Sequence, residues 1–147
     1  MTTPTFNQLV DLGMLELNHG NTLLALQAFE QAATLARTPA LLSCLGFCLA
    51  KEQGEVKQGR SLCLEALKLE PQNALHYLNL GRTYLAANQK MLALQSFRKG
   101  VKIQRHPGIV AELKRLGIRK APVFPFLPRE NFLNRYCGLI LHRLGLH

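Results

Sequence analysis

A leucine–glycine pair recurs along the first two thirds of the chain at a nearly constant interval. It falls at Leu12-Gly13, Leu45-Gly46 and Leu80-Gly81, so that consecutive pairs are 33 and 35 residues apart. A period of this size indicates stacked supersecondary units, because one such unit cannot bury its apolar face alone. With 48% hydrophobic and 18% charged residues, the chain has the composition of a globular protein. At 147 residues it is long enough to fold without a stabilising disulfide or metal ion.

Other residue types recur in register with these pairs. A small residue is followed four positions later by a larger one, in the pairs Ala25 and Phe29, Gly59 and Cys63, and Ala93 and Phe97. The pattern resembles the tetratricopeptide repeat family, whose unit is about 34 residues long. The resemblance implies an all-α solenoid of antiparallel helix pairs, A and B, with three repeats over about 6–38, 39–73 and 74–107. The second repeat departs from the family pattern in Gly59, Cys63 and one extra residue, which we place in the turn 51–55.

Turn and boundary residues predict where each helix begins and ends. Pro39, Pro71 and Pro107 mark boundaries between repeats, and Asn73 suits the N-cap of the third A helix. A solenoid end needs a cap. The predicted helices span 6–18, 22–36, 39–53, 56–69, 73–87 and 90–104, followed by a capping helix within 108–118 that Gly117 ends.

The family resemblance also implies a binding surface, because A helices line the concave side where ligands of this family bind. The residues at the matching positions form an apolar channel with polar anchors at one end: Val10, Met14, Leu17, Phe47, Leu75, Leu78, Asn79 and Arg82. We therefore predict a non-catalytic scaffold or adaptor that binds an apolar or amphipathic segment of another protein. Phe47 and Leu78 can alternatively be core residues that pack between repeats.

One branch of the family clamps the C-terminal carboxylate of heat-shock chaperones with Lys, Asn and Arg side chains. The matching positions here hold Val10, Met14, Cys44, Leu75 and Asn79, of which only Asn79 fits. The sequence therefore disfavours that mode of recognition. Small secretion chaperones built on three such repeats are an analogy, although they are more often acidic than this chain.

The 40 residues after the repeats carry two further patterns. Pro122, Pro125 and Pro128 are three apart, which predicts an extended connector over 119–130. The segment 131–147 predicts a basic amphipathic helix with an apolar stripe made of Phe132, Leu133, Tyr136, Ile140, Leu141 and Leu144. This tail can fold onto its own repeats, bind another protein or a second copy in a homodimer, or lie on an anionic membrane. Our hypothesis is that it occupies the apolar channel on the concave side, of its own chain or of a neighbouring one, until a partner displaces it.

Charge is distributed unevenly along the chain, whose formal net charge is +9. The first 50 residues hold one basic and three acidic residues, whereas the last 40 hold seven basic and two acidic. The alternative function is therefore docking to a membrane surface or a polyanion through the basic C-terminal part. Nucleic acid is the less favoured polyanion, because no aromatic residues interleave with the bases. With no signal sequence and no long apolar run, we expect a cytoplasmic protein, peripheral at a membrane if the tail docks there.

Motifs for catalysis are missing from the sequence. There is no glycine-rich phosphate loop, nucleophile elbow or paired-histidine metal motif, so we expect no enzyme activity, cofactor or metal. The four cysteines are expected to be reduced and Cys44 and Cys48 to be small buried hydrophobes. A dyad of either with His76 is the remaining catalytic alternative, although the five histidines are expected in turns and in the tail.

Overall fold

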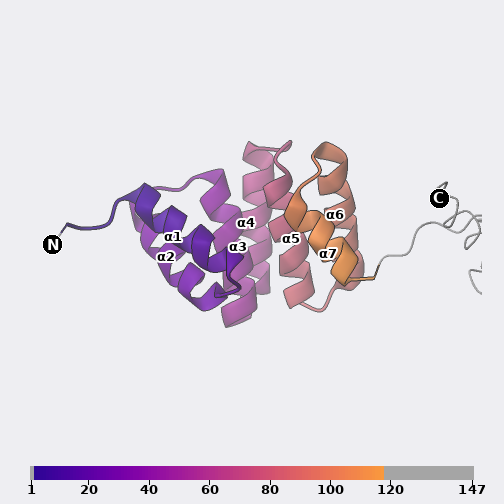
Figure 1. The fold of residues 1–147 in the computed structure, drawn as a ribbon, viewed down its shortest axis with the longest axis horizontal. Helices are drawn as coiled ribbons and strands as arrows, with labels where there is room; N and C mark the ends of the chain where they lie inside the picture. Colours follow the sequence, from indigo (N-terminus) through magenta and orange to yellow (C-terminus); the bar gives the residue numbers. More distant parts are fainter. Residues whose placement is uncertain (1, 118–147) are drawn as a thin grey trace, which may run out of the picture. The chain divides into compact units, whose positions relative to one another are not determined.

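The computed structural model describes residues 2–117. The predicted connector 119–130 and C-terminal helix 131–147 lie outside the described residues. Figure 1 shows seven helices in that part of the chain, coloured from indigo to orange. They are α1 (Phe6–Asn18), α2 (Thr22–Leu35), α3 (Pro39–Gln53), α4 (Val56–Leu69), α5 (Ala74–Ala86), α6 (Lys90–Ile103) and α7 (Pro107–Arg115). The prediction of an all-α helical-repeat fold is confirmed, and the first six helices agree with their predicted bounds to within one residue.

The helix ends follow from local chemistry. Thr5 caps α1 in a capping box with Gln8, and Thr38 caps α3 ahead of Pro39 at the first helical turn. The predicted cap of α5 is confirmed, because the side chain of Asn73 accepts a hydrogen bond from the amide of Leu75. Gly54 ends α3 with a φ of 69°, a left-handed conformation that glycine adopts without strain.

The extra residue of the second repeat lengthens a helix. We placed it in the segment 51–55, and α3 ends there at Gln53, as predicted, with 15 residues against 13 in α1 and in α5. The turn that follows, Gly54 and Glu55, is one residue shorter than the turns 19–21 and 87–89. Two more residues of helix and one fewer of turn give the second repeat its one extra residue.

Consecutive helices pack as the pairs α1–α2, α3–α4 and α5–α6, and neighbouring pairs meet through α2–α3, α4–α5 and α3–α5. Glycines of the Leu-Gly pairs lie where the partners of a pair cross. A Cβ on Gly13 would overlap the ring of Phe29, and a Cβ on Gly81 would overlap the ring of Phe97. Both rings are fully buried, so each glycine leaves the space that an aromatic side chain of the B helix fills.

In the second pair, α3–α4, the glycine faces backbone atoms of the partner helix in place of an aromatic ring. A Cβ on Gly46 would lie 2.5 Å from the carbonyl oxygen of Gly59, and one on Gly59 would overlap the carbonyl of Gly46. The two backbones therefore touch, and the buried thiol of Cys63 replaces the ring found in the other pairs. The departures at positions 59 and 63 are consequently coupled, because closer backbones leave no room for an aromatic side chain.

The capping helix α7 packs on the third pair. Ile109 is fully buried and lies against Gly100 of α6, which also faces the Cβ of Tyr77 of α5. Leu78 of α5 lies against Gly108. Residues 1–113 form one compact unit, so α7 up to Leu113 belongs with the six helices before it.

Candidate functional site

The A helices α1, α3 and α5 supply the predicted binding residues, and we call the surface that they form the A-helix face. Met14 of α1 reaches α3, where its Sδ lies 3.6 Å from the Sγ of Cys44. Four predicted residues are partly buried side chains packed against the core of the first two repeats: Val10, Met14, Leu17 and Leu75. Each keeps part of its apolar surface accessible, as a peptide-contacting residue must.

Two other predicted residues lie beneath this surface. Phe47 is 7% exposed and Leu78 is 3% exposed, so both belong mainly to the packing between repeats. Their burial favours the alternative that they are core residues. They can support the A-helix face, but each has little surface left with which to contact a partner.

Phe47 nevertheless positions two cations at the surface. The ammonium of Lys51 lies 5.9 Å and the guanidinium carbon of Arg82 lies 5.6 Å from the centre of its ring. Both distances are within the range of cation–π attraction. The ring thereby brings a positive charge of α3 and one of α5 to the same place.

Arg82 is also tied to the capping helix. Its Nε donates a hydrogen bond of 3.0 Å to Oε1 of Glu112, and the two side chains are 25% and 11% exposed. This partly buried pair links α5 to α7 and restricts where the guanidinium can move. Our sequence reasoning missed Glu112. The repeat period contained a signal for it, because Glu112 lies one 34-residue repeat after Leu78, which we had predicted as a binding residue.

Asn79, predicted as a polar anchor, has no exposed surface. Its Nδ2 donates hydrogen bonds to Oγ of Ser43 at 3.0 Å and to Sγ of Cys44 at 3.4 Å. Its Oδ1 has no hydrogen-bond partner among the described residues. Asn79 thus joins α5 to α3 from the inside, as part of the interface between repeats.

Ser43 lies in a chain of hydrogen bonds that runs from the buried interface between repeats to the exposed carboxylate of Glu70. Its Oγ lies 2.9 Å from Nδ1 of His76, whose Nε2 lies 2.8 Å from Oε2 of Glu70. When Nε2–H donates a hydrogen bond to the Glu70 carboxylate, Nδ1 can accept a hydrogen bond from the Ser43 hydroxyl. Hydrogen bonds from Asn73 and from His76 lower the pKa of Glu70. His76 therefore lies within α5 and is fully buried, and our placement of the histidines in turns was wrong for it.

The order glutamate, histidine, serine is also that of a hydrolytic triad, but the surroundings differ. Ser43 and His76 both have 0% exposed surface, so a substrate has no access to the hydroxyl. The sulfur atoms are no better placed for attack. Burial raises the pKa of Cys44 to about 11, and that of Cys48 and of Cys63 to about 12. A reactive cysteine needs a lowered pKa, and the ring nitrogens of His76 are hydrogen-bonded to Ser43 and Glu70.

Within residues 2–117 no three histidine, cysteine or acidic side chains come together as they would around a metal ion. None of the helices described there has the length and apolar character needed to cross a bilayer.

Comparisons with known proteins agree with this architecture. A family model of the tetratricopeptide repeat matches residues 62–95. A crystal structure of YrrB, described as a TPR protein with an unusual peptide-binding site, matches with a TM-score of 0.57 and 22% identity. The match covers 77% of this chain but 58% of that chain, so this chain spans little more than half the length of YrrB. No curated protein matches the sequence. The predicted resemblance to the tetratricopeptide repeat family is confirmed.

Proposed function

Because the chain has a tetratricopeptide-repeat fold, we propose that it is a non-catalytic scaffold that binds an apolar or amphipathic segment of another protein on its A-helix face. The observation that carries the proposal is a row of partly buried apolar side chains next to two cations. Val10, Met14, Leu17 and Leu75 supply the row, and Lys51 and Arg82 supply the charges. A bound segment would bury the apolar surface that these side chains leave accessible.

The predicted residues have different roles according to how deeply each side chain is buried. Met14 and Leu75 are accessible enough to touch a ligand, whereas Phe47, Leu78 and Asn79 are buried and hold the surface in shape. Arg82 keeps part of its guanidinium surface and favours a segment with an acidic group near its apolar residues. YrrB is described as having a peptide-binding site, which is consistent with a peptide ligand here.

The proposal can be tested with peptides selected from a random display library on the immobilised full chain. Fluorescence anisotropy would then measure how a selected peptide binds to wild type and to the double variant Met14→Gln, Leu75→Gln. We expect the double variant to bind about 10-fold or more weakly, since each lost apolar contact is worth roughly 1 kcal/mol. Leu69→Gln is the matched control, because Leu69 lies on α4 and is 61% exposed.

The salt dependence of binding distinguishes this function from docking to a polyanion. Apolar binding should change by less than about 3-fold between 50 and 300 mM salt, because screening acts mainly on charged contacts. Binding through the basic C-terminal part should fall steeply over the same range. Selected peptides that bind the double variant as tightly as wild type, or that dissociate steeply with salt, would contradict the proposal.

A further inference from the structure

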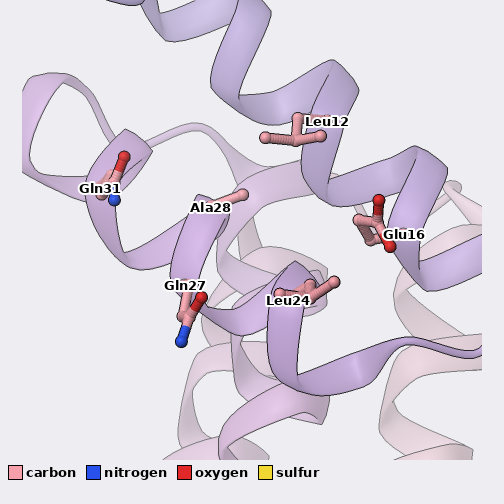
Figure 2. A pocket seen from close by; sticks show the side chains of 6 residues that line it. All are labelled: Leu12, Glu16, Leu24, Gln27, Ala28 and Gln31. Carbon is pink, nitrogen blue, oxygen red and sulfur yellow. The ribbon is translucent and has the colours of Figure 1, made fainter.

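The first helix pair carries an exposed apolar surface away from the A-helix face. Leucines on α1 and α2 remain largely accessible, among them Leu12 at 47% and Leu24 at 49%. These two side chains border one hollow of about 170 Å³ between the helices, as Figure 2 shows. The hollow is also lined by Glu16, Gln27, Ala28 and Gln31, and we call it the end hollow.

A hollow at the same repeat positions recurs inside the solenoid, where α4 borders it; Leu92, the counterpart of Leu24, remains 39% exposed there. Moving each of its six residues 68 positions along the chain gives six residues that line a second hollow of about 250 Å³: Leu80, Tyr84, Leu92, Gln95, Ser96 and Lys99. The second hollow has two additional leucines, Leu64 and Leu67, which come from α4 of the preceding pair. The repeat itself therefore shows what this surface accepts, which is a helix that presents leucines three residues apart.

Burial of the equivalent leucines shows how much surface is left without such a helix. Leu45 and Leu80 are 9% and 5% exposed, whereas Leu12 at the same repeat position is 47% exposed. At roughly 25 cal/mol per Å² of apolar area, covering a leucine of this kind is a substantial gain. The end hollow is thus a surface of the interior type that no described helix covers.

The sequence after the described residues contains a segment with matching chemistry. Within 131–147, Leu141 and Leu144 have the same three-residue spacing as Leu64 and Leu67. The segment carries two arginines and no acidic residue. By contrast, residues 2–35 carry Asp11, Glu16 and Glu30 and no lysine or arginine, and Glu16 lines the hollow. Charge and apolar pattern are therefore complementary.

We propose that the end hollow is a docking site for residues 131–147 of a second copy of this chain. Within the compact unit of residues 1–113, α1 and α7 lie at opposite ends (Figure 1). A copy that offers its C-terminal segment to the hollow of the next makes a head-to-tail contact, which can repeat. This site is separate from the A-helix face, so it stands or falls independently of the proposed function.

The test uses two full-length variants that each disable one side of the contact. Leu12→Glu, Leu24→Glu alters the hollow, and Leu141→Glu, Leu144→Glu alters the segment. Sedimentation velocity of the wild type should show association that grows with concentration, whereas each variant alone should be monomeric. An equimolar mixture of the two should form a heterodimer and nothing larger, since one intact hollow and one intact segment remain. The control Leu69→Glu changes a leucine of α4 that is even more exposed, at 61%, and should associate like wild type.

A peptide experiment locates the contact. A labelled peptide of residues 131–147 should bind the full-length segment variant, and adding Leu12→Glu and Leu24→Glu to that chain should weaken binding at least 10-fold. Adding Met14→Gln instead should leave binding unchanged. A mixture that stays monomeric, or a peptide whose binding depends on Met14 and not on Leu12 and Leu24, would overturn the inference. In the second case the segment would occupy the A-helix face.

Discussion

His76 shows how much of the joint between repeats depends on single polar atoms. Its two ring nitrogens connect a serine of α3 to a glutamate in the turn before α5, and the ring has no contact with water. Removing one member of a buried hydrogen-bond chain leaves its neighbour unsatisfied, at a cost of about 1–3 kcal/mol. The second and third repeats are therefore held in register by specific bonds as well as by apolar packing.

Glu70 makes part of this joint sensitive to acid. The pKa of its carboxyl is lowered from the ordinary value of 4.5 by the hydrogen bonds from Asn73 and His76. A carboxylate with a lowered pKa stabilises the folded chain above the unfolded-state pKa, and this contribution is lost as pH falls through the folded-state pKa. Glu70→Gln should therefore be less stable than wild type at neutral pH, with the difference shrinking as the pH falls below the ordinary carboxyl value of 4.5. Urea unfolding followed by circular dichroism at several pH values measures this, and a pH-independent difference would contradict it.

The buried thiols give a second prediction for single residues. Because Cys44, Cys48 and Cys63 are buried and their pKa values are raised to between about 11 and about 12, they should be protected from alkylation at pH 8. Mass spectrometry after iodoacetamide treatment should find all three labelled in urea and nearly unlabelled in buffer. Rapid labelling of Cys44 in the native chain would show that the interface between α1 and α3 opens readily.

Helix pairs are the next scale, and they show two ways to build the same crossing. In α1–α2 and α5–α6 a glycine faces a buried phenylalanine, while in α3–α4 two glycine backbones touch. The obstacle to a larger residue is a side chain in the first case and a carbonyl group in the second. Only a side chain can be shortened by mutation.

This difference predicts which glycine substitutions can be rescued. Gly81→Ala should cost about 1–3 kcal/mol of stability through overlap with Phe97, and Gly46→Ala at least as much. Adding Phe97→Leu to Gly81→Ala should recover part of the loss, so that the double variant is more stable than the sum of the single effects. Adding Cys63→Ala to Gly46→Ala should recover nothing, because the carbonyl of Gly59 stays in place. Urea unfolding of these four variants, together with Phe97→Leu and Cys63→Ala alone, tests this, and a neutral Gly46→Ala would contradict it.

The molecule as a whole offers surfaces on two different sides of its helix array. The A-helix face has accessible apolar side chains beside Lys51 and Arg82, and the end hollow has exposed leucines beside Glu16. One surface is flanked by cations and the other by an acid. On the two proposals above, ligands of opposite charge character would bind to these surfaces without competing.

An array of repeats should also lose its structure from the ends inward, because each pair contacts only its neighbours. Ile109→Ala removes the buried anchor of α7 and should weaken its docking by about 2–4 kcal/mol. Hydrogen exchange should then accelerate in α7, less in α5 and α6, and hardly in α1 and α2. Val110→Ala is the control, because Val110 is only partly buried. Equal acceleration in all helices would show that the array unfolds as one cooperative unit.

The repeat period by itself determined the helices of this chain. Leu-Gly pairs, prolines and Asn73 act through local backbone preferences, so they placed six helices to within one residue of the structure. What this reasoning did not predict is how the extra residue divides, with α3 two residues longer than α1 and α5 and the turn after it one residue shorter. The tetratricopeptide-repeat fold could be predicted for the same reason, because a repeated pattern of small and large residues allows few packings.

The depth of each side chain was decided by the tertiary structure alone. Asn79 and Met14 both lie on A helices, but Asn79 is fully buried and Met14 is partly exposed, because their surroundings come from different neighbouring helices. The same holds for Leu12, which matches Leu45 and Leu80 in sequence and differs from them only in having no described helix above it. A periodic sequence repeats its residues but not their neighbours, and burial is a property of the neighbours.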